Sequence, residues 1–230
     1  MISQLIRKII LCAVTFGFVI PTVASAQSGI FSGDLSATAA VKSDYRHRGV
    51  SKTNNDFAVQ GSLDWFSDSG VYTGIWASNV SDFKGSDVES NIYLGYTTEV
   101  DGFIYDIGAT AYIYPGGDNA NYFETYGSVG LDFGLLTSSV GIAYIFSNDN
   151  IGDDNLYFYN DTRATIPNTP FSVDLHLGYE DGAFGNNKLD WKIGTSVTFD
   201  QFELGVAYID TNKAGRRSGS GVMFSAEVFF

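Results

Sequence analysis

The sequence predicts an all-β fold, a closed antiparallel up-and-down transmembrane β-barrel of about twelve strands. Three observations lead to this fold. Apolar and polar residues alternate in segments along most of the chain. Short connections between these segments alternate with long ones, and the last segment ends on an aromatic residue, Phe230. A period of two is that of a strand with one apolar and one polar face. Abundant Gly, Tyr and Phe with scarce Pro also favour sheet over helix.

The first 26 residues predict a cleaved signal peptide. Arg7 and Lys8 precede an apolar run over 9–20, and a small-residue site follows at 24–26. The run is shorter than the roughly 20 residues of a membrane-spanning helix. Cleavage after this site leaves one domain, 27–230. It removes two of the 13 basic residues, none of the 26 acidic ones, and the single cysteine, so the formal charge falls from −13 to −15.

This composition excludes some functions. Nucleic acid is not an expected partner, because a phosphate backbone is bound by Lys and Arg rather than by an acidic chain. A mature chain without cysteine has neither disulfides nor thiol chemistry. Asp-rich stretches at 116–119 and 152–155 lack the spacing of a calcium loop, so no metal site and no cofactor are expected.

Alternation defines the candidate strands one after another. Their ranges in chain order are 33–43, 57–66, 71–78, 88–99, 103–114, 121–132, 136–146, 156–166, 171–180, 189–199, 202–209 and 221–230. The clearest is 171–180, where Phe171, Val173, Leu175 and Leu177 alternate with polar residues, and the least clear is 156–166. Most of these lengths match the 9–11 residues that cross a bilayer as a tilted strand.

The connections fall into two classes. Those after the even-numbered strands are short, and their ranges are 67–70, 100–102, 133–135, 167–170 and 200–201. Those after the odd-numbered strands are longer and rich in Gly, Asp and Asn, and their ranges are 44–56, 79–87, 115–120, 147–155, 181–188 and 210–220. Short turns at one rim and long loops at the other are typical of membrane barrels. Closure follows because hydrocarbon leaves no partner for an unpaired sheet edge.

The polar face of these strands would line a lumen. It carries Asp64, Glu89, Glu99, Asp106, Glu124, Asp132, Asp161, Asp174, Glu180 and Asp190, opposed by Lys42, Arg163 and Lys192. Charges inside a barrel require water or partners. Rings of carboxylates favour cations, whereas mutual pairing of acids and bases would plug the barrel instead. The sequence leaves an open, narrow pore and a plugged barrel as alternatives.

Many tyrosines also lie on the polar face. Those near strand ends fit the aromatic girdles at the membrane interface. They also fit a path that stacks against a sugar-like or amine solute, and the sequence does not choose between the two.

Catalysis has one candidate constellation. His176 shares a strand face with Asp174, and Ser172 and Ser196 are candidate neighbours, as a hydrolase would need. A nucleophile elbow and metal-ligand spacing are both missing from the sequence. The protein is therefore not expected to be an enzyme, and a hydrolase is the last of the alternatives.

Several segments resemble one family. They are Asp-Tyr-Arg-His-Arg-Gly-Val-Ser at 44–51, Gly-Val-Tyr-Thr-Gly-Ile-Trp-Ala-Ser-Asn at 70–79, Tyr-Ile-Tyr-Pro-Gly at 112–116 and Asn-Tyr-Phe-Glu at 121–124. This series resembles the proteobacterial Gcw_chp family, also described as TorF-family porins. His47 departs from the pattern, because an aromatic residue such as Phe is expected there.

The resemblance implies an outer-membrane porin of a Gram-negative envelope, with lipids, lipopolysaccharide and small solutes as partners. Phe230 would then be the assembly signal read by the barrel-assembly machinery, as in other outer-membrane barrels. Together with the acidic lumen, the resemblance to this family implies passive diffusion of small cationic or neutral solutes. The alternatives are a non-conducting structural or ligand-binding barrel, and lastly the hydrolase.

Ten residues are candidates for the lumen or its constriction, namely Arg46, Arg48, Asp64, Glu89, Asp106, Glu124, Arg163, Asp174, His176 and Lys192. Arg46 and Arg48 alternate toward the same side of the first long connection. We expect them to pair with lumenal acids such as Glu124 or Asp64, to fix this connection and to narrow the passage. The alternative is a pair of solvated arginines on an exposed loop.

Overall fold

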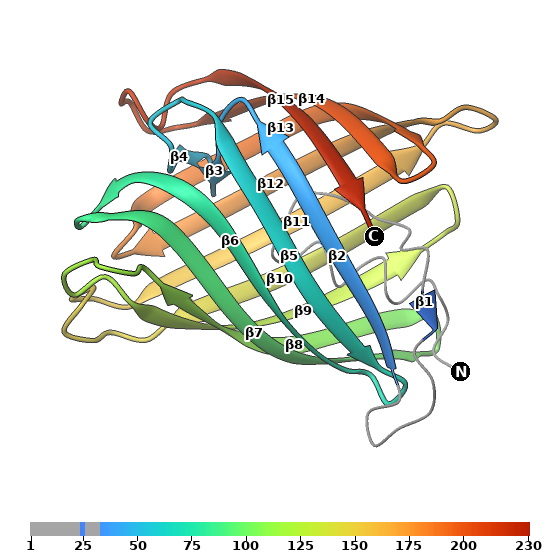
Figure 1. The fold of residues 1–230 in the computed structure, drawn as a ribbon, viewed down its shortest axis with the longest axis horizontal. Coiled ribbons are helices and arrows are strands. Elements are labelled where there is room, and N and C mark those ends of the chain that lie inside the picture. The colour runs from blue at the N-terminus through green and yellow to red at the C-terminus, as the bar shows by residue number, and fades with distance from the viewer. Residues whose placement is uncertain (1–23, 26–32) are drawn as a thin grey trace.

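The structure is a computed structural model that describes residues 24–25 and 33–230. Twelve antiparallel strands close into a barrel, which confirms the predicted fold (Figure 1). In order around the ring they are β2 (Gly33–Lys42), β5 (Ala58–Ser67), β6 (Val71–Phe83), β7 (Ser86–Val100), β8 (Phe103–Ile113), β9 (Tyr122–Asp132), β10 (Leu136–Ile145), β11 (Asn155–Thr165), β12 (Phe171–Gly182), β13 (Gly185–Phe199), β14 (Phe202–Thr211) and β15 (Gly221–Phe229). Each strand pairs with its sequence neighbour, and β15 pairs with β2.

The ladder that closes the ring is short. β15 and β2 share five residue pairs, from Ser225 opposite Lys42 to Phe229 opposite Thr38, whereas β2 and β5 share ten. Phe230 extends this seam, because its backbone exchanges hydrogen bonds of 2.9 and 3.2 Å with Ala37. Both ends of the barrel domain therefore lie at the rim of the short turns.

Beyond the end of β15, a two-residue strand, β1 (Ala24–Ser25), pairs with β2 at Leu35 and Asp34. These two residues belong to the predicted signal peptide, and the rest of that segment lies outside the described residues. No helix within the described residues is long and apolar enough to cross a membrane.

Two long connections turn out to be tight hairpins. β6 continues to Phe83 instead of ending at 78, and β13 begins at Gly185 instead of 189. In both hairpins the register shifts near the tip, between Asn79 and Phe83 and between Glu180 and Gly182. Such a bulge breaks the two-residue alternation from which the strand ends are predicted, so the sequence places these ends too early or too late.

The barrel has its apolar side chains outside and its polar side chains inside. Outward residues such as Phe123, Ile107 and Val59 are 65–68% exposed, whereas the inward Asp64, Glu89, Asp106, Glu124 and Glu180 are 1–6% exposed. Water-soluble proteins show the opposite distribution. A closed sheet with all backbone groups paired and an apolar outer surface is stable in the hydrocarbon core of a bilayer.

Glycines allow tyrosine rings to lie flat against the inner wall. A Cβ atom at Gly95 would sit 2.3 Å from the ring of Tyr72, and one at Gly141 would sit 2.2 Å from the ring of Tyr159. The rings of Tyr93, Tyr126 and Tyr157 cover Gly74, Gly108 and Gly178 in the same way. Glycine is therefore required where a ring from the next strand approaches the backbone so closely.

Candidate functional site in the barrel lumen

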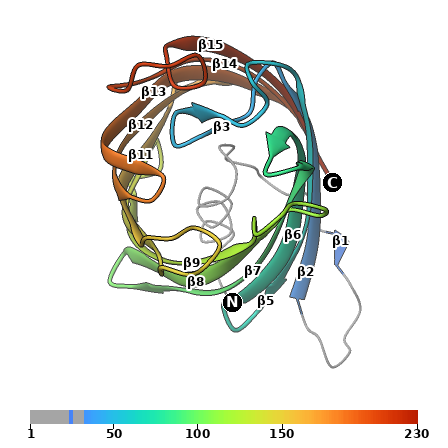
Figure 2. The ribbon, with the colours of Figure 1, turned by 90° about the vertical axis from the view of Figure 1, so that its left-hand side faces the viewer.

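The first long connection, residues 43–57 in the structure, folds into the barrel rather than over it, and we call it the inserted loop (Figure 2). Its short strands β3 (Arg46–His47) and β4 (Val50–Ser51) form a hairpin with a two-residue turn. Both turn residues are left-handed, Arg48 with φ 49° and Gly49 with φ 78°. Positive φ at both positions defines a type I′ turn, where Asn or Gly is usual and arginine is rare.

The base of the inserted loop is held by bonds within the loop and to the connection between β14 and β15. Arg46 donates to Asp44 at 2.7 Å and to the carbonyl oxygen of Gly219 at 2.5 Å. Asp44 also accepts from the hydroxyls of Ser51 at 2.6 Å and Thr53 at 3.0 Å. These bonds hold the hairpin so that its tip points into the lumen.

At the tip, Arg48 crosses from the loop to two strands. Its Nη1 donates to Glu180 of β12 at 2.9 Å, and its Nη2 donates to Glu124 of β9. Its guanidinium carbon lies 4.2 Å from the ring centroid of Tyr157 in β11. All three charged side chains are buried. Although burial opposes the charge, the two carboxylates hold the pKa of Arg48 well above its ordinary value.

Other residues of the inserted loop pack among aromatic rings. The Tyr45 hydroxyl donates to Glu89 at 2.9 Å, and the His47 ring meets Tyr112 edge-on at 5.9 Å between centroids. Lys52 Nζ lies 4.7 Å from the ring centroid of Phe83. Burial, and then the neighbouring cations, lowers the pKa of His47 well below its usual value. Burial likewise lowers the pKa of Lys52.

The inward side chains of β5–β9 form what we call the tyrosine wall, because its carboxylates are held by phenol hydroxyls. Tyr93 donates to Asp64, Tyr72 to Asp106 at 2.8 Å, Tyr112 to Glu124 at 3.2 Å and Tyr114, just beyond β8, to Glu89 at 2.7 Å. These five strands contain no Lys or Arg. The cations that reach this wall from the inserted loop are Arg48 and Lys52.

The inward side chains of β11–β14 form the opposite face, which we call the ion-pair wall. Arg163 lies 2.6 Å from Glu203 and 3.5 Å from Asp174. His176 is held between Asp161 at 2.8 Å and Asp190 at 3.0 Å, and Lys188 pairs with Glu180. On this wall the carboxylates have basic partners from the strands themselves.

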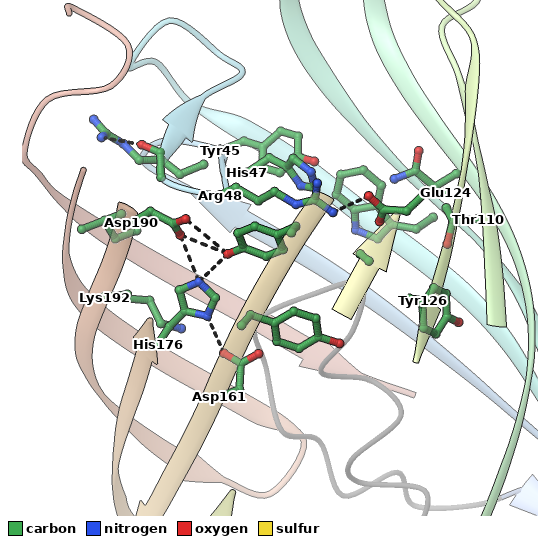
Figure 3. Close-up of a pocket in the computed structure, with 18 of the residues that line it drawn as sticks. Tyr45, His47, Arg48, Thr110, Glu124, Tyr126, Asp161, His176, Asp190 and Lys192 are labelled. Atoms are coloured by element: carbon green, nitrogen blue, oxygen red, sulfur yellow. Dashed lines mark hydrogen bonds and ion pairs between the residues drawn. The ribbon is translucent and has the colours of Figure 1, made fainter. Parts of the chain in front are cut away.

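A cavity of about 110 Å³ lies between the two walls, on the inner side of the loop tip (Figure 3). Arg48, Glu124, Tyr157, His176 and Lys192 contribute to its lining. A water molecule occupies about 30 Å³ of liquid, so the cavity has room for several waters or a small polar group. Within the described residues, no group of three or more His, Cys, Asp or Glu side chains could hold a metal ion.

The structure brings together part of the expected constellation. Arg48 pairs with Glu124, one of its two expected partners, whereas Asp64 accepts from Tyr93 instead. Arg46 stays at the loop base with Asp44 and does not cross the lumen, because the hairpin geometry gives the crossing position to Arg48 alone. The alternative of two solvated arginines on an exposed loop is wrong.

The remaining candidates divide between the walls. Glu89 and Asp106 belong to the tyrosine wall, while Arg163, Asp174, His176 and Lys192 belong to β11–β13. Phe230 is 59% exposed at the seam. Three important residues were not among the candidates, namely Glu180, Lys188 and Tyr157. The alternation places Glu180 on the polar face, but nothing local marks it as the partner of a residue 132 positions away.

The candidate hydrolase constellation, the last of the alternatives, is not assembled. Ser172 and Ser196 both hydrogen-bond to Arg163 Nη2, at 2.9 and 2.5 Å, and Asp174 also faces Arg163. His176 lies four positions from Ser172 along β12, a separation of about 13 Å on a strand. Its ring nitrogens bond to Asp161 and Asp190, and Tyr157 lies 2.8 Å from Nε2. The arrangement is a hydrogen-bonded network in which the histidine is fixed from both sides.

Several solved structures with a similar fold are outer-membrane porins or channels. The KdgM porin has a TM-score of 0.59 at 10% identity, covering 85% of this chain and 98% of its own. The NanC porin has a TM-score of 0.57 at 10% identity with the same coverage. The COG4313 outer-membrane channel of Pseudomonas putida F1 has a TM-score of 0.52 at 9% identity, covering 90% of this chain and 97% of its own. At these identities the likeness shows the fold.

No curated protein matches the sequence. A sequence model described as "Bacterial protein of unknown function (Gcw_chp)" matches residues 24–226, which is most of the chain. The resemblance carried by the segments at 44–51, 70–79, 112–116 and 121–124 is thereby confirmed. The protein belongs to the Gcw_chp family of bacterial proteins, and it has the barrel fold of outer-membrane porins.

Proposed function

We propose that the protein is an outer-membrane channel for small cationic or neutral solutes, narrowed by its inserted loop. The apolar belt supports a position in lipid, and the fold is shared with porins. Lipids and lipopolysaccharide would surround the belt, and the strand ending at Phe230 would present the barrel to the assembly machinery of a Gram-negative envelope.

The observation that carries this proposal is the tyrosine wall. Its carboxylates at Asp64, Glu89 and Asp106 have phenol partners and no basic residue in the same strands, whereas Glu124 also pairs with Arg48 of the inserted loop. A phenol hydroxyl stabilises a carboxylate by hydrogen bonding but does not cancel its charge. A lumen wall with uncancelled negative charge attracts cations and repels anions.

The inserted loop supports a narrow passage. It lies within the ring of strands, and the cavity beside its tip has a volume of only about 110 Å³ (Figure 2). The tip occupies part of the lumen beside this cavity, so a wider passage requires the tip to move. Arg48 is the residue that holds the tip, because it bonds to both sides of the lumen.

A non-conducting structural or binding barrel is the second candidate, and one observation favours it. The ion pairs of Arg48 with Glu124 and Glu180 are buried and lie across the lumen, as in a permanent plug. Breaking a buried pair of this kind is strongly unfavourable. In that case the loop would remain in place, and the polar walls would serve folding alone.

Conductance separates the two candidates. Residues 27–230, refolded and inserted into a planar bilayer, are expected to give stepwise currents, with a reversal potential under a salt gradient that indicates cation preference. Arg48→Ala is expected to raise the single-channel conductance several-fold, and Arg216→Ala, an exposed arginine of another loop, serves as the matched control. A folded barrel that carries no current in either the parent chain or Arg48→Ala would contradict the proposal and support the plug.

A further inference from the structure

We infer that Glu124, Glu180 and Tyr157 form a binding site for a guanidinium group, which Arg48 of the chain itself occupies, and that guanidinium-bearing solutes compete with Arg48 for it. This inference names a solute class for the proposed channel and rests on that proposed function. The competition would make the solute the agent that releases the inserted loop.

The shape of the site matches a planar cation. Two carboxylates receive the edge of the guanidinium, Glu180 at Nη1 and Glu124 at Nη2, and the ring of Tyr157 covers its face at 4.2 Å. Figure 3 shows the pair of Arg48 with Glu124. Edge hydrogen bonds together with aromatic stacking distinguish guanidinium from an ammonium or a metal ion, which have no flat face. The same arrangement that holds Arg48 would therefore select among free solutes.

The strands build this site without help from the loop. Glu124 accepts from Tyr112 at 3.2 Å, and Glu180 accepts from Asn155 at 3.0 Å and pairs with Lys188. The Tyr157 hydroxyl lies 2.8 Å from His176 Nε2. Because partners from β8, β11, β12 and β13 orient all three groups, the site would persist after the loop tip has left.

Arg48, which occupies the site, is held only weakly by the backbone of its own turn, whereas the strands hold Glu124, Glu180 and Tyr157 firmly. Arg48 sits in a left-handed conformation (φ 49°) at the tip of a two-residue turn, a conformation that arginine rarely adopts. The site therefore keeps the tip in place more than the turn does. Since the cavity reaches Arg48, Glu124 and Tyr157 from the inner side, a solute in the lumen meets the site directly.

Tethering sets the concentration at which competition occurs. A group held by a short loop acts at an effective concentration in the millimolar range. A free guanidinium solute at lower concentration leaves Arg48 in place, and one at higher concentration displaces it. The passage would then widen as solute accumulates.

The test measures conductance with guanidinium chloride added to one chamber and sodium chloride at equal ionic strength as the reference. In the parent chain, millimolar guanidinium is expected to increase the current, because it releases the tip. In Arg48→Ala the current starts high, and guanidinium is expected to reduce it, because the solute now fills the vacated site. This reversal of sign would not arise if Arg48 had only a structural role.

Two further variants identify the site. Arg48→Ala combined with Glu124→Gln is expected to lose the guanidinium block, while Arg48→Ala combined with Glu99→Gln, an exposed carboxylate outside the site, is expected to keep it. If Arg48→Ala does not fold, Arg48→Lys serves instead, because its ammonium lacks the flat face and should be displaced at lower guanidinium concentration. Equal responses to guanidinium in the parent chain and in the Arg48 variant would overturn the inference.

Binding measured in detergent keeps this inference separate from the proposed function. Calorimetric titration of Arg48→Ala with guanidinium chloride is expected to show affinity at least about tenfold higher than the parent chain, since about one charge-assisted hydrogen bond is worth that ratio. Binding without any bilayer current would refute the channel and leave the site intact. Current without this difference in binding would refute the site and leave the channel intact.

Discussion

The two walls of the lumen hold similar numbers of carboxylates by different chemistry. On the tyrosine wall, Asp64, Glu89 and Asp106 accept hydrogen bonds from phenols, and Glu124 accepts one from Tyr112 while it also pairs with Arg48 of the inserted loop. On the ion-pair wall, Glu203, Asp174 and Glu180 meet Arg163 or Lys188. Phenols preserve negative charge, and cations cancel it. The barrel therefore has one wall suited to attracting a cation and one suited to rigid closure, and Arg48 joins them.

The largest loss of stability is expected where a charge in a buried ion pair loses its partner. Arg163→Met leaves Glu203 buried without the guanidinium that lies 2.6 Å away. An uncompensated buried charge costs about 3–5 kcal/mol, so the free energy of unfolding should fall by about that amount. The measurement is urea unfolding in lipid vesicles followed by tryptophan fluorescence. Arg216→Met is the control, and a loss under about 1 kcal/mol would mean that water already reaches Glu203.

A smaller effect is expected on the tyrosine wall. Tyr72→Phe removes a hydroxyl that donates to Asp106 at 2.8 Å and lies 2.7 Å from the Tyr126 hydroxyl. The expected loss is about 1–2 kcal/mol, because one hydrogen bond to a charged group disappears while the ring still packs. Tyr96→Phe on the exposed outer face is the matched control. If Tyr72→Phe destabilised the barrel as much as Arg163→Met, the distinction between the walls would be lost.

The smallest effect concerns how pH changes the stability of the inserted loop, which connects the two walls. His47 in the inserted loop has a pKa well below its usual value, through burial and then the nearby cations Arg48, Lys52 and Lys188. Between that lowered pKa and the unperturbed value of about 6.5, the released loop binds more protons than the inserted loop. Insertion is therefore favoured above about pH 6.5 and weakened progressively as the pH falls below it.

Acidification should thus raise the current through the parent chain. His47→Phe keeps a ring against Tyr112, which it meets edge-on, and removes the titratable group. Its current is expected to vary less with pH between about 7.5 and 5, the range around the free histidine pKa. An unchanged pH profile in His47→Phe would assign the titration to another lumenal group.

Much of the fold could be predicted from the sequence, because each strand separates an apolar face from a polar one. All twelve barrel strands appear where the alternation places them, and β8 differs from its predicted range by a single residue at its end. The prediction fails at β6 and β13, where bulges near hairpin tips interrupt the period. Regular periodicity therefore locates strands but does not show how far they extend beyond the membrane.

The site could be predicted only in part. Alternation identifies which acids face the lumen, so the pairing of Arg48 with Glu124 could be predicted from the sequence. Its second partner, Glu180, depends on the curvature that turns the inner face of β12 toward that of β9, with two strands between them, and sequence spacing carries no record of that. The left-handed turn at Arg48 and Gly49 could not be predicted either, because a type I′ turn favours Asn, Asp or Gly at its first position and arginine is rare there.

The five-pair seam between β2 and β15 joins the two ends of the barrel domain. Its formation confines almost the whole domain in a single loop, so it has the largest closure entropy of any ladder in the sheet and gains few bonds in return. We therefore expect it to be the last ladder to form, and its amides to exchange hydrogen before those of β8 or β12. Until this ladder forms, the sheet has two edges with unpaired backbone N–H and C=O groups, which are strongly unfavourable in hydrocarbon. The terminal strand is the part of the chain that an insertion catalyst would have to hold.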